Sequence, residues 1–175
     1  MEDAIAKVAP NTDSAEDLLQ MVGFGVAEEL FGVDILMVQE IIKDITITPI
    51  PDSPDFIEGV VNLRGNIIPI IDLRKRLKLS EKKSVEQEAV WIIILNIGDR
   101  VTGFVVDFVT RVVKVPANSI KPAPDMVVSG LKSDYIRGVC KQENKLMAIL
   151  DFNKILLVDE FKKVSAMRKQ KAITQ

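Results

Sequence analysis

The chain has 175 residues, of which 47% are hydrophobic, so it is long enough to bury a substantial core. Its 23 basic and 25 acidic residues are interspersed and give a net charge of −2, which argues against nucleic acid as a partner. Histidine is absent and Cys140 is the single cysteine. The chain therefore lacks the commonest general base, a cysteine cluster for zinc and an internal disulfide.

The N-terminal residues 1–17 are acidic and have neither the basic start nor the long apolar centre of a signal peptide. We expect them to form a disordered tail. No apolar run in the sequence reaches the roughly 18 residues that a membrane span needs. A cytoplasmic protein without direct membrane insertion is therefore predicted.

A β-hairpin with a turn at residues 27–29 is predicted in LLQMVGFGVAEELFGVDI. The next segment, ILMVQEIIK, is predicted to be a strand with apolar residues on both faces. With a period of two residues, Ile35 and Ile41 face one way, and Val38 and Glu40 face the other. Such a strand is typical of a docking surface or of a seam between two barrels.

A 22-residue segment that begins at residue 56 occurs a second time, 79 residues later, without a gap. FIEGVVNLRGNIIPIIDLRKRL in the first copy matches YIRGVCKQENKLMAILDFNKIL in the second. Each copy reads as strand, turn, strand and the start of a helix. The identical pairs are Ile57/Ile136, Gly59/Gly138, Val60/Val139, Ile70/Ile149, Asp72/Asp151, Lys75/Lys154 and Leu77/Leu156.

Identical residues within the repeat predict its local geometry. Gly59 and Gly138 interrupt their strands at the same place, which indicates a bulge or a sharp bend. Asp72 and Asp151 each follow a strand and precede a helical pattern, so we expect both to be N-caps. Cys140 stands where the first copy has a valine and is interpreted as a small core residue rather than a nucleophile.

The repeat extends upstream of this segment at an offset of 71 residues. WIIILNIGDRVTGFVVD matches the opening hairpin and has a turn at residues 98–100. Since the offset rises from 71 to 79, the second copy contains an eight-residue insertion before Tyr135, in a stretch rich in proline, glycine and serine. We assign residues 1–17 to a tail, 18–82 and 90–158 to two β-barrel subdomains, 83–89 to a connector, and 159–175 to the end of a C-terminal helix and its tail.

About five short strands in each copy predict a mainly β fold of two tandem five-stranded β-barrels. Short helices and a C-terminal helix complete the prediction. The two subdomains are expected to form one domain, and the opening strand of one copy can cross into the other barrel.

The copies differ at the tip of one hairpin. Arg64-Gly65 in the first copy is replaced by Glu143-Asn144 in the second. Gly65 and Asn144 hold the position that most needs a positive φ, so we expect the turn to be kept while the charge before it reverses. A solvated side chain at the tip and a charged group at a binding surface are both compatible with this pattern.

A second charge reversal accompanies the first. Glu40 in the first copy matches Arg111 in the second. We predict that Glu40 pairs with Arg64, and Arg111 with Glu143. An exposed ion pair stabilises a fold by only about 0–1 kcal/mol. At the lip of a groove such a pair could instead orient both groups toward a partner.

No catalytic constellation is present. Asp107 lies at a predicted strand end, and Asp52 and Asp55 flank a proline in a loop, but no nucleophile is paired with a base. GFG at residues 23–25 lacks a third glycine and does not open a helix, so no dinucleotide site is predicted. We therefore expect no enzymatic activity, no cofactor and no metal.

The segment VQEIIKDITITPIPDSPDFIEGVVNLRGNIIPIIDLRKRL strongly resembles the CheW-type coupling proteins of bacterial chemotaxis. The V-x-E-I segment, the I-P connection and the F-I-x-G-V-x-N-L-R-G-x-I-x-P-I-x-D-L run all match, and N-L-R-G in this setting is highly specific. GFVVDFVTRVVKV and AILDFNKIL look like the second half of the family, so the resemblance covers about residues 18–158. Many members have a glycine where this chain has Phe108, a departure that concerns the local shape of the groove.

The resemblance implies a non-catalytic scaffold of two SH3-like barrels that bridges transmembrane chemoreceptors and the histidine kinase CheA at membrane receptor arrays. It implies that the cytoplasmic receptor tip docks between the barrels and that the kinase's regulatory domain, itself CheW-like, binds barrel ends. On this basis the receptor-side residues are Ile35, Val38, Glu40, Gly59, Arg64 and Val106. The kinase-side residues are Ile50, Pro51 and Phe56.

Three alternatives stay open. The first is a related regulatory module, such as the regulatory domain of a CheA kinase or the adaptor half of a CheV protein, although the chain has no room for a receiver or a kinase core. The second is a small enzyme on a β-barrel scaffold, for which Asp107 would be the residue to mutate. The third is a nucleic-acid-binding barrel, which the low aromatic content of 5% disfavours.

Overall fold

The structure is a computed structural model that describes residues 17–79, 90–123 and 133–156. Four short helical turns lie between strands of the described ranges, and a fifth follows the last strand: η1 (Ile35–Met37), α2 (Leu73–Arg76), η2 (Ala117–Ser119), η3 (Ser133–Tyr135) and finally α3 (Phe152–Ile155). The strands of the described ranges are β1 (Leu18–Val26), β2 (Glu29–Asp34), β3 (Val38–Lys43), β4 (Ile57–Leu63), β5 (Asn66–Asp72), β6 (Trp91–Ile97), β7 (Arg100–Val106), β8 (Phe108–Pro116), β9 (Ile136–Gln142) and β10 (Lys145–Leu150).

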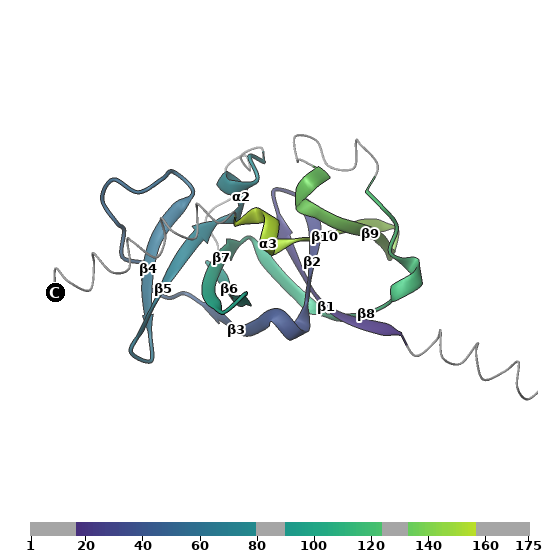
Figure 1. Cartoon of the computed structure of the whole chain (residues 1–175), viewed down its shortest axis with the longest axis horizontal. Helices are drawn as coiled ribbons and strands as arrows, with labels where there is room; N and C mark the ends of the chain where they lie inside the picture. Colours follow the sequence, from purple (N-terminus) through teal and green to yellow (C-terminus); the bar gives the residue numbers. More distant parts are fainter. Residues whose placement is uncertain (1–16, 80–89, 124–132, 157–175) are drawn as a thin grey trace, which may run out of the picture.

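These strands form two five-stranded sheets, which occupy the left and right halves of Figure 1. Sheet I, on the left, has the order β3-β6-β7-β5-β4, and sheet II, on the right, has the order β8-β1-β2-β10-β9. The mainly β prediction with two five-stranded units is confirmed. Each sheet curls in an SH3-like manner but is not a closed barrel. Its two edges are joined by an isolated bridge, Thr48 to Val60 in sheet I and Lys121 to Val139 in sheet II.

Each sheet combines strands from both sequence copies. The hairpin β1–β2 of the first copy lies in sheet II, and the hairpin β6–β7 of the second copy lies in sheet I. A parallel ladder attaches each exchanged hairpin to its new sheet, β2 to β10 and β7 to β5. The ranges 18–82 and 90–158 therefore delimit the sequence copies, whereas the chain crosses between sheets after β2 and again after β7. The sequence predicted that one opening strand can cross into the other barrel, and in the structure both strands of the opening hairpin cross.

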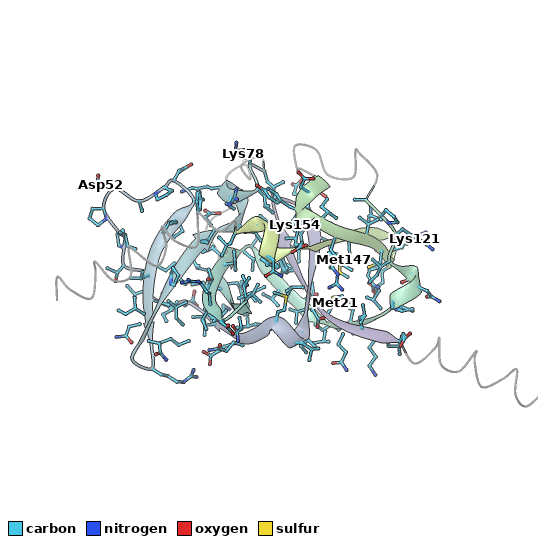
Figure 2. The ribbon with its side chains drawn as sticks, in the orientation of Figure 1. Met21, Asp52, Lys78, Lys121, Met147 and Lys154 are labelled. Carbon is cyan, nitrogen blue, oxygen red and sulfur yellow. The ribbon has the colours of Figure 1, made fainter. Side chains whose placement is uncertain are left out.

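Alternate residues of one strand enter different cores. In β6, Ile92 and Ile94 pack inside sheet I, whereas Ile93 packs in a larger cluster that contains residues of both sheets. Met21 and Met147, which are labelled in Figure 2, belong to the core inside sheet II. Because both faces of these strands are buried, the sequence shows continuous apolar runs instead of alternation. The inter-sheet cluster holds the two sheets together as one unit.

The predicted turns and caps are confirmed. Ala27 and Glu28 form the first hairpin turn with φ angles of 52° and 71°, and residues 98–99 form the equivalent turn. In both hairpins the last predicted turn residue is already the first residue of the next strand. The carboxylate of Asp72 accepts hydrogen bonds from the N–H groups two and three residues ahead at 2.9 and 3.3 Å. The carboxylate of Asp151 does the same at 3.1 and 3.3 Å.

Both predicted glycine bends are confirmed. Pairing between β4 and β5 shifts register next to Gly59, and pairing between β9 and β10 shifts next to Gly138. Gly59 has a φ of +150°, and a Cβ atom there would lie 2.1 Å from the carbonyl oxygen of Thr48. A Cβ atom at Gly138 would lie 2.4 Å from Cγ2 of Ile120. In each sheet the bend lets the segment that bridges the two edges approach the backbone closely.

The prediction of one strand over ILMVQEIIK is wrong in two respects. Its first three residues form η1, which Asp34 caps by accepting a hydrogen bond from Leu36 N–H at 2.9 Å. Pairing with β6 then shifts register between Val38 and Glu40, so Val38 and Ile41 both pack against the inter-sheet cluster. The physical reason is that the chain crosses from sheet II to sheet I here, and a crossing interrupts a two-residue period.

Several predictions concern residues outside the described ranges. They are the N-terminal tail, the connector at residues 83–89, most of the eight-residue insertion and the helix end at residues 159–175. The described part of the predicted C-terminal helix is α3, near the centre of Figure 1. Its side chains Phe152 and Ile155 are buried in the inter-sheet cluster.

Candidate functional site

A bidentate ion pair joins the two edges of sheet I. Arg64 Nη2 lies 2.5 Å from Glu40 Oε1, and Arg64 Nη1 lies 3.1 Å from Glu40 Oε2. Glu40 comes from β3, and Arg64 lies in the β4–β5 turn, where Arg64 and Gly65 both have positive φ angles, 53° and 85°. The predicted pairing of Glu40 with Arg64 is confirmed, and so is the positive φ of Gly65.

The hydrogen bond from the Arg64 guanidinium lowers the pKa of the Glu40 carboxyl below its ordinary value of 4.5. The same bond raises the pKa of Arg64. Glu40 is 25% exposed, whereas Arg64 is 71% exposed at the hairpin tip. The surface therefore presents an ionised carboxylate that one arginine partly covers, and a partner could reach either group from solvent.

The equivalent pair in sheet II is looser. Arg111 Nη2 on β8 lies 3.7 Å from Glu143 Oε1 in the β9–β10 turn, and the side chains are 85% and 86% exposed. The predicted pairing is confirmed with reversed charges. The turn keeps its geometry, with φ angles of 46° at Glu143 and 68° at Asn144. At 3.7 Å the contact is a surface ion pair and not a direct hydrogen bond.

A pocket of about 500 Å³ lies beside the sheet II pair, with Arg111 and Glu143 among its lining residues. Leu30, Val113, Leu146 and Met147 give it an apolar lining, and two glutamates, at the β1–β2 turn and at the start of β2, also line it. Phe108 also lines the pocket and is 45% exposed. Its ring covers Gly25, since a Cβ atom on that glycine would lie 2.0 Å from Cε1 of Phe108. Sequence reasoning noted Phe108 as a departure from the family but did not find the pocket.

The residues assigned to the receptor side do not all reach the surface. Ile35 and Val38 are half-buried against the inter-sheet cluster, which also contains Val106. Val106 is 3% exposed, and Gly59 is buried against the bridging segment. Glu40 lies two residues beyond Val38 on β3, so the charge pair and these half-buried apolar residues come from neighbouring positions of one chain segment. Gly59 and Val106 have roles in the fold that account for their residue types.

The residues assigned to the kinase side separate into two environments. Pro51 is exposed and Ile50 is half-buried in the loop before β4, whose outer end is marked by Asp52 in Figure 2. Phe56 is half-buried, and its ring centroid lies 5.3 Å from the Arg76 guanidinium. Tyr135, the repeat counterpart of Phe56, lies at the same distance from Arg76. Phe56 therefore contributes to a stack that joins the two copies.

Asp107 has a structural environment that sequence reasoning missed. It lies between β7 and β8, and both of its carboxylate oxygens accept hydrogen bonds from Arg74 Nη2, at 2.7 and 2.8 Å. It also accepts a hydrogen bond from Ala27 N–H at 2.9 Å. The repeat contained a sign that Arg74 has a specific role. Like Arg64, Arg74 is a charged residue that the second copy does not keep, since its counterpart there is Asn153.

Cys140 lies in the core of sheet II, as predicted. Burial raises the pKa of its thiol, which disfavours the nucleophilic thiolate. Among the described residues, no group of three or more histidine, cysteine, aspartate or glutamate side chains is arranged to hold a metal ion. No helix in the same ranges is both long and apolar enough to cross a membrane.

Residues 20–160 match the family model of the CheW-like domain. The chain belongs to this family. It is 38% identical over 165 residues to the chemotaxis protein CheW of Klebsiella aerogenes, covering 94% of this chain and 95% of that protein. It is 36% identical over 152 residues to the chemotaxis protein CheW of Treponema pallidum, covering 86% and 89% of the two chains.

The fold also matches a solved member of the CheW-like family. The crystal structure of the scaffolding protein TtCheW from Thermoanaerobacter tengcongensis superposes with a TM-score of 0.72 at 38% identity. The match covers 81% of this chain and 90% of that one. The present chain is thus a coupling scaffold of chemotaxis signalling, as the sequence resemblance implied.

Proposed function

We propose that the chain is a non-catalytic cytoplasmic adaptor that holds the cytoplasmic tip of a chemoreceptor and the histidine kinase CheA in a fixed relative geometry. The observation that carries the proposal is the Glu40–Arg64 pair, whose glutamate lies on the same chain segment, η1 and β3, as the half-buried apolar residues Ile35 and Val38. A receptor helix needs such a surface, because its apolar face requires a hydrophobic groove and its charged flank requires complementary groups at the rim.

The kinase is proposed to bind elsewhere on the same molecule, with Ile50 and Pro51 as contacts. Two separate surfaces suit an adaptor, since simultaneous binding raises the local concentration of one partner near the other. Phe56 acts in this proposal by holding the copies together through Arg76, and less by direct contact. Signalling requires that the receptor's states differ in how they hold the kinase, because tight binding alone shifts no equilibrium.

A non-catalytic role is supported by the engagement of Asp107, the acid considered for an enzymatic alternative. Its carboxylate is already bound by Arg74 and by the backbone of Ala27. Because both carboxylate oxygens already accept hydrogen bonds from these donors, they are not free to approach a substrate proton. Turnover by the purified chain in a broad hydrolase screen, lost in Asp107→Asn, would contradict this part of the proposal.

The receptor-side proposal is tested by titrating a soluble chemoreceptor hairpin fragment against Arg64→Glu and Glu40→Arg. We expect each variant to fold and to bind about tenfold more weakly. Each places a like charge next to its former partner and reverses one of the charges that the surface presents to the receptor. Arg111→Glu, which perturbs the equivalent pair of sheet II, is the matched control and should bind as the parent protein does. Unchanged receptor affinity in both sheet I variants contradicts the proposed site.

The double variant Glu40→Arg/Arg64→Glu separates two roles of the pair. It preserves an ion pair across the edges of sheet I with the charge order that sheet II already has. Restored receptor affinity would mean that the pair only supports the surface. Affinity that stays low would mean that the individual charges contact the receptor, which is the result we expect.

A further inference from the structure

The second crossing between the sheets is held by one residue, Asp107, which bonds to one segment of each sheet. Asp107 N–H donates to the carbonyl oxygen of Gly25 at 2.8 Å. Its carboxylate accepts from Ala27 N–H at 2.9 Å and from Arg74 Nη2 at 2.7 and 2.8 Å. Gly25 and Ala27 belong to the exchanged hairpin in sheet II, whereas Arg74 lies on α2, directly after β5 of sheet I. The Arg74–Asp107 pair therefore ties the two sheets together.

The Arg74–Asp107 pair is more shielded from solvent than the pairs at the hairpin tips. Its side chains are 24% and 20% exposed. The buried Nε of Arg74 has no hydrogen-bond partner within the described ranges. A guanidinium that has lost this much water depends strongly on its carboxylate, so separating the two groups is unfavourable.

The rest of the contact between the sheets is largely apolar. The inter-sheet cluster is built from side chains such as Phe24, Ile93 and Phe104, and apolar packing has little directional preference. Hydrogen bonds to a carboxylate are directional, because donor and acceptor must stay within a narrow range of distance and angle. The Arg74–Asp107 pair is thus well suited to select one relative orientation of the sheets among those that apolar packing tolerates.

The first crossing has no equivalent of this pair. At the offset of the opening hairpin, the counterpart of Asp107 is Leu36, which is 88% exposed on η1. The counterpart of Arg74 is Asn153. Although the backbone is duplicated, among the described residues only the crossing after β7 is tied by a shielded ion pair, so its charges are not required by the repeated fold.

We propose that Arg74 and Asp107 are positioning residues that set the orientation of the two sheets and thereby preorganise the receptor-side surface. Asp107 directly follows Val106, which packs with Ile35 and Val38 in and around the inter-sheet cluster. A change in sheet orientation would therefore move the apolar part of that surface. This inference rests on the proposed receptor-binding function, and a preorganised surface binds more tightly because less conformational freedom is lost on binding.

Pulsed electron–electron double resonance tests the orientation directly. Spin labels are placed at Asn96→Cys in sheet I and Lys114→Cys in sheet II, two exposed strand positions. The background is Cys140→Val, which uses the valine of the first copy. We expect a narrow distance distribution in the parent and a broader or displaced one in Asp107→Asn. Glu143→Gln, which removes the acid of the exposed sheet II pair, is the control and should match the parent.

The same variants are then titrated with the receptor hairpin fragment and, separately, with the regulatory domain of CheA. We expect Asp107→Asn to bind the receptor fragment several-fold more weakly and the kinase domain as the parent does. If Asp107→Asn does not fold, Arg74→Met/Asp107→Asn removes both charges and leaves no unpaired guanidinium. An unchanged distance distribution, or a broadened one with unchanged receptor affinity, overturns the inference. A parent protein that binds no receptor fragment defeats the proposed function instead, and the distance measurement still reports whether the pair orients the sheets.

Discussion

The Glu40–Arg64 pair of sheet I and the Arg111–Glu143 pair of sheet II occupy equivalent positions in the two copies but interact differently. The first is bidentate with contacts of 2.5 and 3.1 Å, whereas the second is a single contact of 3.7 Å between almost fully exposed side chains. The duplication has preserved the strand, the turn and the presence of two opposite charges. It has not preserved their order or their closeness. A repeated backbone can thus carry two surfaces with separate uses.

Among matched substitutions in the two sheets, the largest difference in the free energy of unfolding is expected at the glycine bends. Gly59→Ala places a Cβ atom against the backbone of Thr48 at a φ of +150°, so we expect a loss of about 2–4 kcal/mol in the free energy of unfolding. Gly138→Ala meets Cγ2 of Ile120 at 2.4 Å and the backbone only at 3.1 Å, at the carbonyl oxygen of Lys121, and it does not require a positive φ, so it should cost less, about 1–2 kcal/mol. Urea denaturation of both variants checks this, and equal losses would show that the two bends are equivalent.

The next largest difference in stability is expected between removing the arginine of a shielded ion pair and removing the arginine of an exposed one. Arg74→Met leaves the Asp107 carboxylate without its guanidinium, and we expect a loss of about 2 kcal/mol, below the range for fully buried pairs because both groups keep some solvent contact. Arg111→Met should change stability by less than about 0.5 kcal/mol. Thermal and urea melts of the two variants provide the measurement. If Arg111→Met loses as much stability as Arg74→Met, the shielded pair does not stabilise the fold more than the exposed pair.

A smaller effect is expected at Phe108, which lines the pocket of sheet II. Phe108→Ala removes a ring that covers Gly25 but is 45% exposed, so we expect a loss of about 1 kcal/mol. Met37, its repeat counterpart on η1, provides the comparison in Met37→Ala. If the kinase domain binds Phe108→Ala more weakly than Met37→Ala, the pocket belongs to the kinase-side surface. Equal binding would separate the pocket from that surface.

The smallest effect is a pH dependence at Glu40. Its pKa in the folded protein is below the ordinary value of 4.5, because it accepts hydrogen bonds from Arg64. The unfolded state therefore binds protons first as the pH falls, so the stabilisation is complete above 4.5 and disappears as the pH drops through the folded-state pKa. The stability difference between the parent and Glu40→Gln should shrink over that interval. In an Arg64→Gln background, the stability difference between Glu40 and Glu40→Gln should not change with pH over this interval. If it still changes, the pH dependence belongs to a group other than the Glu40–Arg64 pair.

Features that depend on neighbouring residues could be predicted from the sequence. The caps at Asp72 and Asp151 and the turn at Gly65 require only groups within a few residues, and their φ angles and hydrogen bonds follow from residue type. The two charge pairs were also predictable, because the repeat supplied a comparison that a single copy lacks. Reversal of both charges at matched positions indicates that they interact in each copy.

The tertiary structure alone decided which strands share a sheet and which distant groups meet. Strands such as β1 and β6 are apolar on both faces, so their pattern does not say which sheet each face meets, and the exchange of hairpins leaves no local trace. The contacts of Asp107 with Arg74 and of Arg76 with Tyr135 join residues far apart in the sequence. They exist because the chain crosses between the sheets, and that path is set by the packing of the whole core and not by any single segment.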